Sequence, residues 1–395
     1  MIDYNAFSDR SVSNAEKYTL RETLFGTTDV IPMWVADMDI QTPPCIRDAV
    51  KRRAAHEVYG YEEMPDSAFE AQIQWIQKRH HYQVKREWML YSHSVVASIS
   101  VAIQTFSNPG DKVIVQTPVY PPFFGQVSLN GREVLKNPLK KEGTDDYTFD
   151  IEDLRSKIDA KTKLLLLCSP HNPVGRVWKR EELEAIATLC LEHDIMVFAD
   201  EIHSDLVYAP HKHIPFASLS KEVEAITITA MGPGKTFNVA GLATSTIIIA
   251  DARKREAYDK VYQAIHFAQG NVFGHAGFEA AYKEGEAWLE GVLTHLRLNV
   301  QALKNMLQSH SDKIELSIPE GTYLAWLDCS KMGLSEKELR RFFIESAALG
   351  LSPGLSFSKE GKQHMRLNFA VPSQTMNEAI AQLDLALSSY EDQGF

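Results

Sequence analysis

The stretch LLLLCSPHNPVG, residues 164–175, places an apolar run of strand length directly before a turn rich in proline and glycine. Several such runs are apolar at consecutive positions, as buried parallel strands are. Between two of them, Arg180–His193 gathers its apolar residues on one helical face. The alternation predicts an α/β fold with a mostly parallel sheet. The expected strands are Lys112–Gln116, Leu164–Cys168, Ile195–Ala199, Ala225–Thr229 and Thr246–Ala250.

A second pattern follows this region. From about Ala252 to His310 the sequence is helical in character and contains no candidate strand. Strand-like runs and helical stretches then alternate, which predicts a small α+β domain. Its expected strands are Ile314–Ile318, Thr322–Asp328 and Met365–Ala370, and its helices are Glu336–Leu349 and Ser373–Tyr390.

The length of 395 residues exceeds what one hydrophobic core usually supports. We therefore expect two closely packed domains. The large one comprises residues 47–285, and the small one combines an N-terminal segment, residues 1–46, with residues 286–395.

The charge balance limits the possible partners. Lysine and arginine number 41 against 52 aspartate and glutamate residues, a formal net charge of −11. Because nucleic-acid binding needs clustered positive charge, we expect no such partner, and the basic run Lys51–Arg53 is expected to be a solvated helix face. The sequence has neither a signal-peptide run nor an apolar stretch of about 18 residues, which predicts a cytoplasmic protein without a membrane span.

The cysteines are spaced without a CxxC pattern. This scatter predicts reduced, mostly buried thiols and no metal site. The four are Cys45, Cys168, Cys190 and Cys329.

Three polar segments each follow an expected strand. They are SPHNPVG at residues 169–175, DEIH at 200–203 and GKTFN at 234–238. Taken singly, each has an ordinary interpretation, as a turn starter, a helix cap and a solvated loop lysine. Because open parallel sheets bind ligands at the carboxyl ends of their strands, we expect Asn172, Asp200 and Lys235 to converge there.

In this order the segments resemble the fold-type I pyridoxal phosphate enzymes, the aminotransferase superfamily. The resemblance implies that Lys235 holds the cofactor as a Schiff base, that Asp200 faces the pyridine nitrogen and that Asn172 bonds the phenolic oxygen. The residue types suit the chemistry. A carboxylate keeps the ring nitrogen protonated, so that the ring can accept electrons, and a lysine can lose its proton near neutral pH where an arginine cannot.

The same resemblance implies further site residues. Tyr120 is expected to stack on the ring and act in catalysis, and Arg366 to clamp the substrate carboxylate. A core tyrosine and a solvated strand arginine are the alternative interpretations. The other expected cofactor contacts are His203, Ser94, Val95, Val96 and Tyr61, and the other substrate contacts are Ala36 and Asn172.

Two of these expectations concern particular surroundings. Ser94–Val96 would place backbone amides against the phosphate, although a serine at a helix start is also an ordinary N-cap. Tyr61 would reach the phosphate site of a neighbouring subunit, which predicts a homodimer.

Within the superfamily the sequence is most similar to the cystathionine β-lyase type of carbon–sulfur lyase. His203 stands where many aminotransferases carry tyrosine. The resemblance implies β-elimination from an amino-acid substrate, giving a thiol, pyruvate and ammonia. An aminotransferase and a pyridoxal phosphate-binding regulatory protein remain the alternatives. The segments that carry the resemblance are residues 35–39, 58–61, 168–173, 200–203, 235–238 and 322–327.

The sequence departs from this pattern at three positions. Gly232 and Gly234 occupy places where relatives often carry serine, and Ala243 replaces the usual arginine. Phosphate anchoring is therefore expected to depend on the helix start after Ser92, on backbone amides and on Tyr61.

Overall fold

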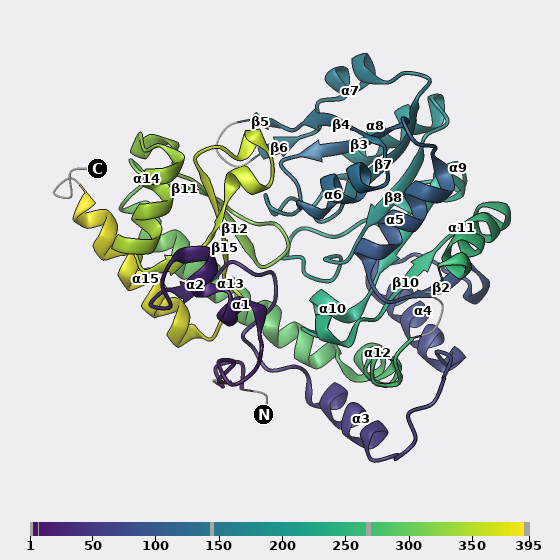
Figure 1. Ribbon diagram of the computed structural model, residues 1–395, viewed down its shortest axis with the longest axis horizontal. Helices are drawn as coiled ribbons and strands as arrows, with labels where there is room; N and C mark the ends of the chain where they lie inside the picture. Colours follow the sequence, from purple (N-terminus) through teal and green to yellow (C-terminus); the bar gives the residue numbers. More distant parts are fainter. Residues whose placement is uncertain (1–2, 7, 143–145, 266–269, 391–395) are drawn as a thin grey trace.

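A seven-stranded sheet forms the larger part of the computed structural model, which describes residues 3–6, 8–142, 146–265 and 270–390 (Figure 1). Strand β10 runs antiparallel to both of its neighbours, and the other pairs are parallel. The predicted mostly parallel α/β sheet is confirmed. Across the sheet the order is β2 (Met89–Ser92), β10 (Ser245–Ile248), β9 (Thr227–Met231), β8 (Met196–Asp200), β7 (Thr162–Cys168), β3 (Lys112–Thr117) and β4 (Glu133–Pro138).

Helices connect and cover these strands. The helix α8 (Arg180–Glu192) buries Leu183, Ile186 and Cys190, the apolar face expected from its spacing. The basic run Lys51–Arg53 lies in the last turn of α3 at the surface, as predicted. The other helices of this part are α3 (Pro44–Ala54), α4 (Asp66–His80), α5 (Val95–Phe106), α6 (Pro122–Leu129), α7 (Ile151–Lys157), α9 (Lys221–Ile226), α10 (Pro233–Thr236), α11 (Ala252–Ala264) and α12 (Val272–Glu284).

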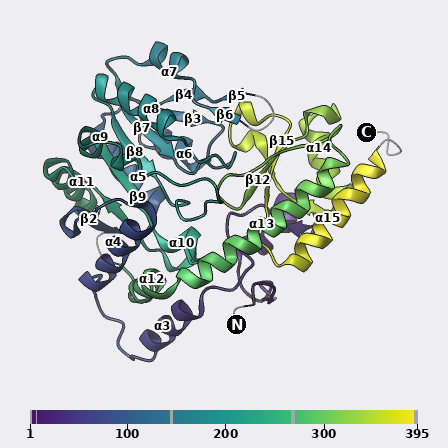
Figure 2. The same cartoon turned by 180° about the vertical axis from the view of Figure 1, so that it is seen from behind.

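The second part contains a four-stranded antiparallel sheet. The long helix α13 (Glu286–Gln308) runs from α12 towards it and packs against α15 (Ser373–Ser388), as Figure 2 shows. The expected mixture of strands and helices is present, whereas the domain limits at residues 46 and 285 remain a prediction. The strands, in order, are β11 (Glu315–Ser317), β12 (Leu324–Asp328), β15 (His364–Asn368) and β14 (Ser352–Pro353).

The N-terminal segment is attached to this second part by backbone pairing. Strand β1 (Ile31–Pro32) pairs in parallel with β13 (Leu349–Gly350). Ahead of it lie the short helices α1 (Glu16–Thr19) and α2 (Arg21–Phe25). Residues near the start of the chain and residues near its end therefore form one two-stranded sheet.

Two expected elements were wrong in part. Ala225 and Ile226 belong to α9 rather than to a strand, because the Ser220 side chain accepts from the Val223 amide and caps a helix there. The helix expected over Glu336–Leu349 stops early. The regular helix α14 ends at Arg341, a wider turn follows over Phe342–Ser346, and Leu349 pairs in β13.

A buried charge cluster fixes the segment after β1. The Lys17 ammonium is fully buried and lies 2.7 Å from an oxygen of Asp39. Arg10 reaches both Asp37 and Asp39, at 2.6 Å each. Each charge lies partly or fully out of water and is compensated by a charge of opposite sign. Removal of one of them would therefore leave another without its partner.

Within the described part of the chain, no helix is both long and apolar enough to cross a membrane. All four cysteines are free; Cys168, Cys190 and Cys329 are buried and Cys45 is partly exposed. The prediction of mostly buried thiols is confirmed.

We expect Leu166→Ala to lower the free energy of unfolding by about 2–5 kcal/mol, because it would leave a cavity in the core. Leu166 lies on the central strand β7 and is 1% exposed. Urea unfolding followed by circular dichroism would measure the change. Leu385→Ala is the matched control, because Leu385 is 71% exposed and its loss should cost less than about 0.5 kcal/mol. Equal effects of the two variants would contradict the assignment of β7 to the core.

Candidate active site

A cavity of about 610 Å³ lies at the carboxyl ends of the central strands. Asn172 follows β7, Asp200 ends β8 and Lys235 lies on α10 just after β9, and all three line the cavity. The register places Cys168 opposite Asp200, and Asp200 opposite Ala230. The parallel register therefore brings three segments distant in sequence to one edge of the sheet.

Most of the residues proposed from the sequence meet at this cavity. Tyr61 does not line it; its side chain is 92% exposed on the connection between α3 and α4. Within one subunit the site is thus assembled without Tyr61. The lining includes Ala36, Ser94, Val95, Val96, Tyr120, Asn172, Asp200, His203, Lys235 and Arg366.

Lys235 is held at the cavity wall by a backbone contact. Its Nζ donates to the carbonyl oxygen of Ala36 at 2.6 Å. Enclosure by protein lowers the pKa of Lys235 to about 8, and Arg366 adds to this effect while Asp37 and Asp200 oppose it. This amine therefore loses its proton at a much lower pH than an ordinary lysine does, which suits a group that takes up and releases a proton.

The lysine loop is also fastened to the segment that carries Ala36. The Asn238 side chain accepts from the Met38 amide at 3.0 Å and donates to the carbonyl oxygens of Met38 and Ile40, at 3.0 and 2.8 Å. These three hydrogen bonds tie the loop that carries Lys235 to the segment that carries its acceptor, the Ala36 carbonyl.

Asp200 and His203 are both buried beside the lysine. Burial raises the pKa of Asp200 to about 7, an effect opposed by a hydrogen bond from the Ile202 amide and by the charge of Lys235. Burial, with Lys235 and Arg366 nearby, lowers the pKa of His203 to about 3, so that its ring is neutral. The Nδ1 atom of His203 has no hydrogen-bond partner among the described residues. A polar ligand could form hydrogen bonds with both the Asp200 carboxyl group and the His203 Nδ1 atom.

Arg366 reaches the cavity from the second sheet. It donates to the Asn172 side-chain oxygen at 3.0 Å and to the carbonyl oxygen of Trp34 at 2.7 Å. Burial lowers its pKa to about 10, which still leaves it a cation at neutral pH. No carboxylate in the described part of the chain forms an ion pair with it. The guanidinium is therefore available for a ligand carboxylate, which it can bind through two parallel hydrogen bonds.

The start of α5 offers a second anion-binding feature. Its N-cap, Ser94, has extended backbone angles, and its side chain makes no capping hydrogen bond. Val95 and Val96 follow as the first helical residues and line the cavity. The amides of this first turn point outward from the helix end, where its dipole favours a negative group.

The two glycines near the lysine differ in the space around them. A Cβ atom on Gly232 would lie 2.9 Å from the Cβ of Ser245, so a side chain there requires the backbone to shift. A Cβ on Gly234 would meet no atom closer than 3.7 Å. The departure at Gly232 therefore reflects close packing of the lysine loop on β10, whereas packing does not require glycine at position 234.

Sequence reasoning missed several residues at or next to the cavity. Tyr323 does not line it, but its hydroxyl donates to the Ala36 carbonyl oxygen at 2.8 Å and thus shares the acceptor of Lys235. Trp34 contributes its backbone carbonyl to Arg366. Tyr323 stood in a recognised segment without a role, and a backbone carbonyl has no signal in the sequence. Glu16, His93 and Thr244 also line the cavity.

This fold and this arrangement of a lysine, an aspartate and an asparagine at strand ends define the aminotransferase-like class of α/β proteins. The profile of the family "Aminotransferase class I and II" matches residues 28–383, and the chain belongs to this family.

The relatives include named carbon–sulfur lyases. The chain is 40% identical to cystathionine beta-lyase PatB of Bacillus subtilis, over 98% of this chain and 100% of that protein. It matches the pyridoxal 5'-phosphate-containing structure of cystalysin from Treponema denticola with a TM-score of 0.95 and 32% identity, over 99% and 100% of the two chains. The PLP-bound C-S lyase from Staphylococcus hominis in its L-cycloserine complex matches with a TM-score of 0.89 and 31% identity, over 98% and 99%.

The raised pKa of Asp200 gives a test in the ligand-free protein. Between its ordinary value of 3.8 and about 7, the unfolded carboxyl loses its proton while the folded one keeps it. The free energy of unfolding therefore falls as pH rises through this range. We expect Asp200→Asn to remove this fall, so that the variant resists urea better than the wild type at about pH 8 and behaves like it at about pH 3.5. A difference that is the same at both pH values would show that titration of Asp200 is not its cause.

Proposed function

We propose that this protein is a pyridoxal phosphate-dependent carbon–sulfur β-lyase that cleaves cysteine S-conjugates to a thiol, pyruvate and ammonia. The observation that carries the proposal is the full-length 40% identity to a relative named cystathionine beta-lyase. The geometry of the site supports it, because Lys235, Asp200 and Arg366 line one cavity.

The residues present fit the cofactor. Lys235 would hold its aldehyde carbon, Asp200 its pyridine nitrogen, and Asn172 and His203 its phenolic oxygen. Tyr120 would stack on the ring. The start of α5, at Ser94, Val95 and Val96, would hold the phosphate. The unpartnered Nδ1 of His203 and the uncapped end of α5 are the features that a polar, anionic ligand would satisfy.

The remaining roles concern the substrate. Arg366 would bind the α-carboxylate, with Asn172 and Ala36 beside it. When bound, pyridoxal phosphate supplies an electron sink for the negative charge that develops at Cα. Lys235, poised with a pKa of about 8, would remove the Cα proton.

The Ala36 carbonyl accepts from the amine at the cavity wall, and the Tyr323 hydroxyl donates to the same carbonyl. Cleavage of the Cβ–S bond leaves the electron pair on sulfur, and the proton held by Lys235 is available to the departing thiolate. Overall, one water is consumed and no external oxidant or reductant is needed.

The proposal predicts that cystathionine, or another cysteine S-conjugate, releases a thiol, pyruvate and ammonia continuously without any added 2-oxo acid. Thiol detection and a pyruvate assay would measure it, and Lys235→Ala should abolish both the turnover and the visible absorbance of the lysine-bound cofactor. Turnover that stops after one equivalent per subunit and resumes only with a 2-oxo acid would identify an aminotransferase instead.

We propose further that the active unit is a homodimer in which Tyr61 completes the neighbouring site. Tyr61, Tyr59 and Val58 are 92%, 56% and 65% exposed, a concentration of apolar surface that an isolated subunit would leave in water. A separate groove beside α3 is lined in part by the apolar residues Ile46, Val50, Val239 and Leu242. Contact with a second copy of this chain would remove the exposed residues and the groove from water.

A shared site can be tested by mixing two inactive proteins. We expect Lys235→Ala and Tyr61→Ala, each impaired alone, to recover activity when their subunits exchange, because one site of each hybrid then has both residues intact. Subunit exchange would be verified by mass spectrometry of differently tagged chains, and tagged wild-type protein serves as the control. Exchange without recovery would show that Tyr61 does not serve the neighbouring subunit's site.

The free cysteines suit a reducing compartment, and we propose the cytoplasm.

A further inference from the structure

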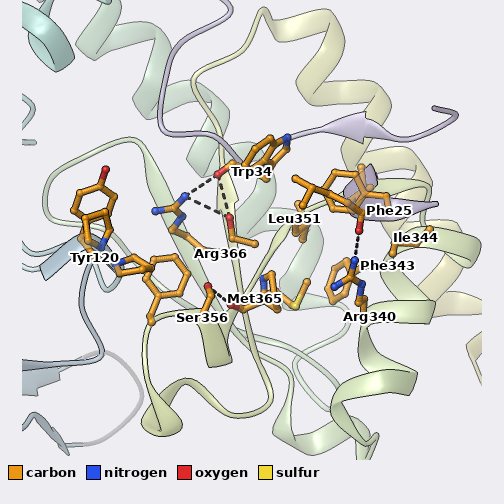
Figure 3. Close-up of a pocket in the computed structure, with 17 residues that line it drawn as sticks. Phe25, Trp34, Tyr120, Arg340, Phe343, Ile344, Leu351, Ser356, Met365 and Arg366 are labelled. Carbon is orange, nitrogen blue, oxygen red and sulfur yellow. Dashed lines mark hydrogen bonds between the residues drawn. The ribbon is translucent and has the colours of Figure 1, made fainter. Parts of the chain in front are cut away.

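A second pocket, of about 380 Å³, adjoins the cavity of Lys235 (Figure 3). We call it the apolar pocket. Its walls come from α2, from the wide turn after α14 and from the strands that join the two ends of the chain. Phe25, Phe343, Ile344, Leu349, Leu351 and Phe357 are among its lining residues.

The apolar pocket and the larger cavity share a boundary. Trp34, Tyr120 and Arg366 line both. In Figure 3, Tyr120 stands at one end, Arg340 at the other and Arg366 between them. The Arg366 guanidinium carbon also lies 4.8 Å from the centre of the Phe357 ring, so this side chain has an aromatic neighbour in the wall of the apolar pocket.

We propose that the apolar pocket receives the group carried on sulfur, and that the preferred substrates are cysteine conjugates with an aromatic or branched aliphatic S-substituent. This inference rests on the proposed lyase function. It concerns the part of the substrate beyond sulfur.

The position of the pocket supports this assignment. A substrate with its α-carboxylate on Arg366 and its Cα near Lys235 would lie in the cavity that Tyr120 and Trp34 also line. These two side chains and Arg366 line both cavities. The sulfur substituent is therefore assigned to the adjoining apolar pocket.

The size and lining of the pocket indicate the chemistry of the group. A volume of about 380 Å³ lies in the range of small-molecule sites and exceeds the roughly 150 Å³ that admits benzene. The ammonium and carboxylate at the far end of cystathionine would lose their hydration against such walls. Arg340, a charged residue at the far end, is exposed and donates to the Leu24 carbonyl oxygen.

The test compares substrates that differ only beyond sulfur. For the holoenzyme we expect kcat/KM for S-benzyl-cysteine to exceed that for S-methyl-cysteine about tenfold or more, because the ring leaves water. Cystathionine should be the poorer substrate relative to S-benzyl-cysteine. Ile344→Trp, which fills the pocket without touching the Lys235 cavity, should reduce the benzyl-to-methyl ratio at least tenfold.

Leu385→Trp is the matched control. It adds the same ring to an exposed position on α15, outside the pocket, and should leave the ratio unchanged. Thermal unfolding of both variants verifies that they are folded. If Ile344→Trp does not fold, Ile344→Ala takes its place and should shift the preference towards a larger naphthylmethyl group.

A binding measurement separates this inference from the lyase proposal. The analogues 2-amino-5-phenylpentanoate and norvaline carry carbon in place of sulfur and cannot undergo elimination. Titration of the cofactor spectrum should show tighter binding of the phenyl compound to the wild type, and loss of that advantage in Ile344→Trp.

Two results would overturn the inference: an unchanged benzyl-to-methyl ratio in folded Ile344→Trp, or cystathionine as the better substrate. Absence of thiol release from every conjugate, with the phenyl preference still present in binding, would reject the lyase proposal and support the pocket.

Discussion

The hydrogen bond from Arg366 to the side chain of Asn172 joins the two sheets of the molecule at the site. Arg366 belongs to β15 in the smaller sheet, and Asn172 follows β7 in the larger one. The guanidinium gains an acceptor from the larger sheet and the Asn172 side-chain oxygen gains a donor from the smaller one, so each part satisfies a polar group of the other. The second bond, to the Trp34 carbonyl, adds the N-terminal segment to the same junction.

The segment around Ala36, which belongs to this junction, is held in place by ion pairs and by side-chain hydrogen bonds. Asp37 and Asp39 are paired with Arg10 and Lys17 on one side. On another, the Asn368 amide donates to the backbone carbonyls of Val35 and Asp37 at 2.5 and 2.6 Å. The Ala36 carbonyl therefore accepts from Lys235 without a rearrangement of the backbone. The paired charges next to Ala36 thus help to hold the acceptor of the Lys235 amine in place.

The sequence allowed the sheet and the convergence of its loops to be anticipated for one physical reason. Consecutive apolar residues such as those at 164–168 require burial on both faces, and strand direction then fixes where the loops meet. Where a local signal competed, the expectation failed, as at Ala225, where the Ser220 cap extends a helix. Leu349 was also misplaced, because β13 exists only through pairing with residues more than 300 positions earlier. No local pattern encodes such a partner.

The parallel pair of β1 and β13 has a consequence for how the molecule is made on the ribosome. The seven strands of the large sheet have all been synthesised once Ile248 is added, whereas Ile31 has no strand to join until Leu349 follows. Arg366 comes later still. The earliest residues to leave the ribosome are thus among the last to find their places, and they must stay soluble while most of the chain is translated. The charged residues Arg10, Lys17, Asp37 and Asp39 all belong to this segment, so they can pair with one another and favour its hydration before its partner strand is present.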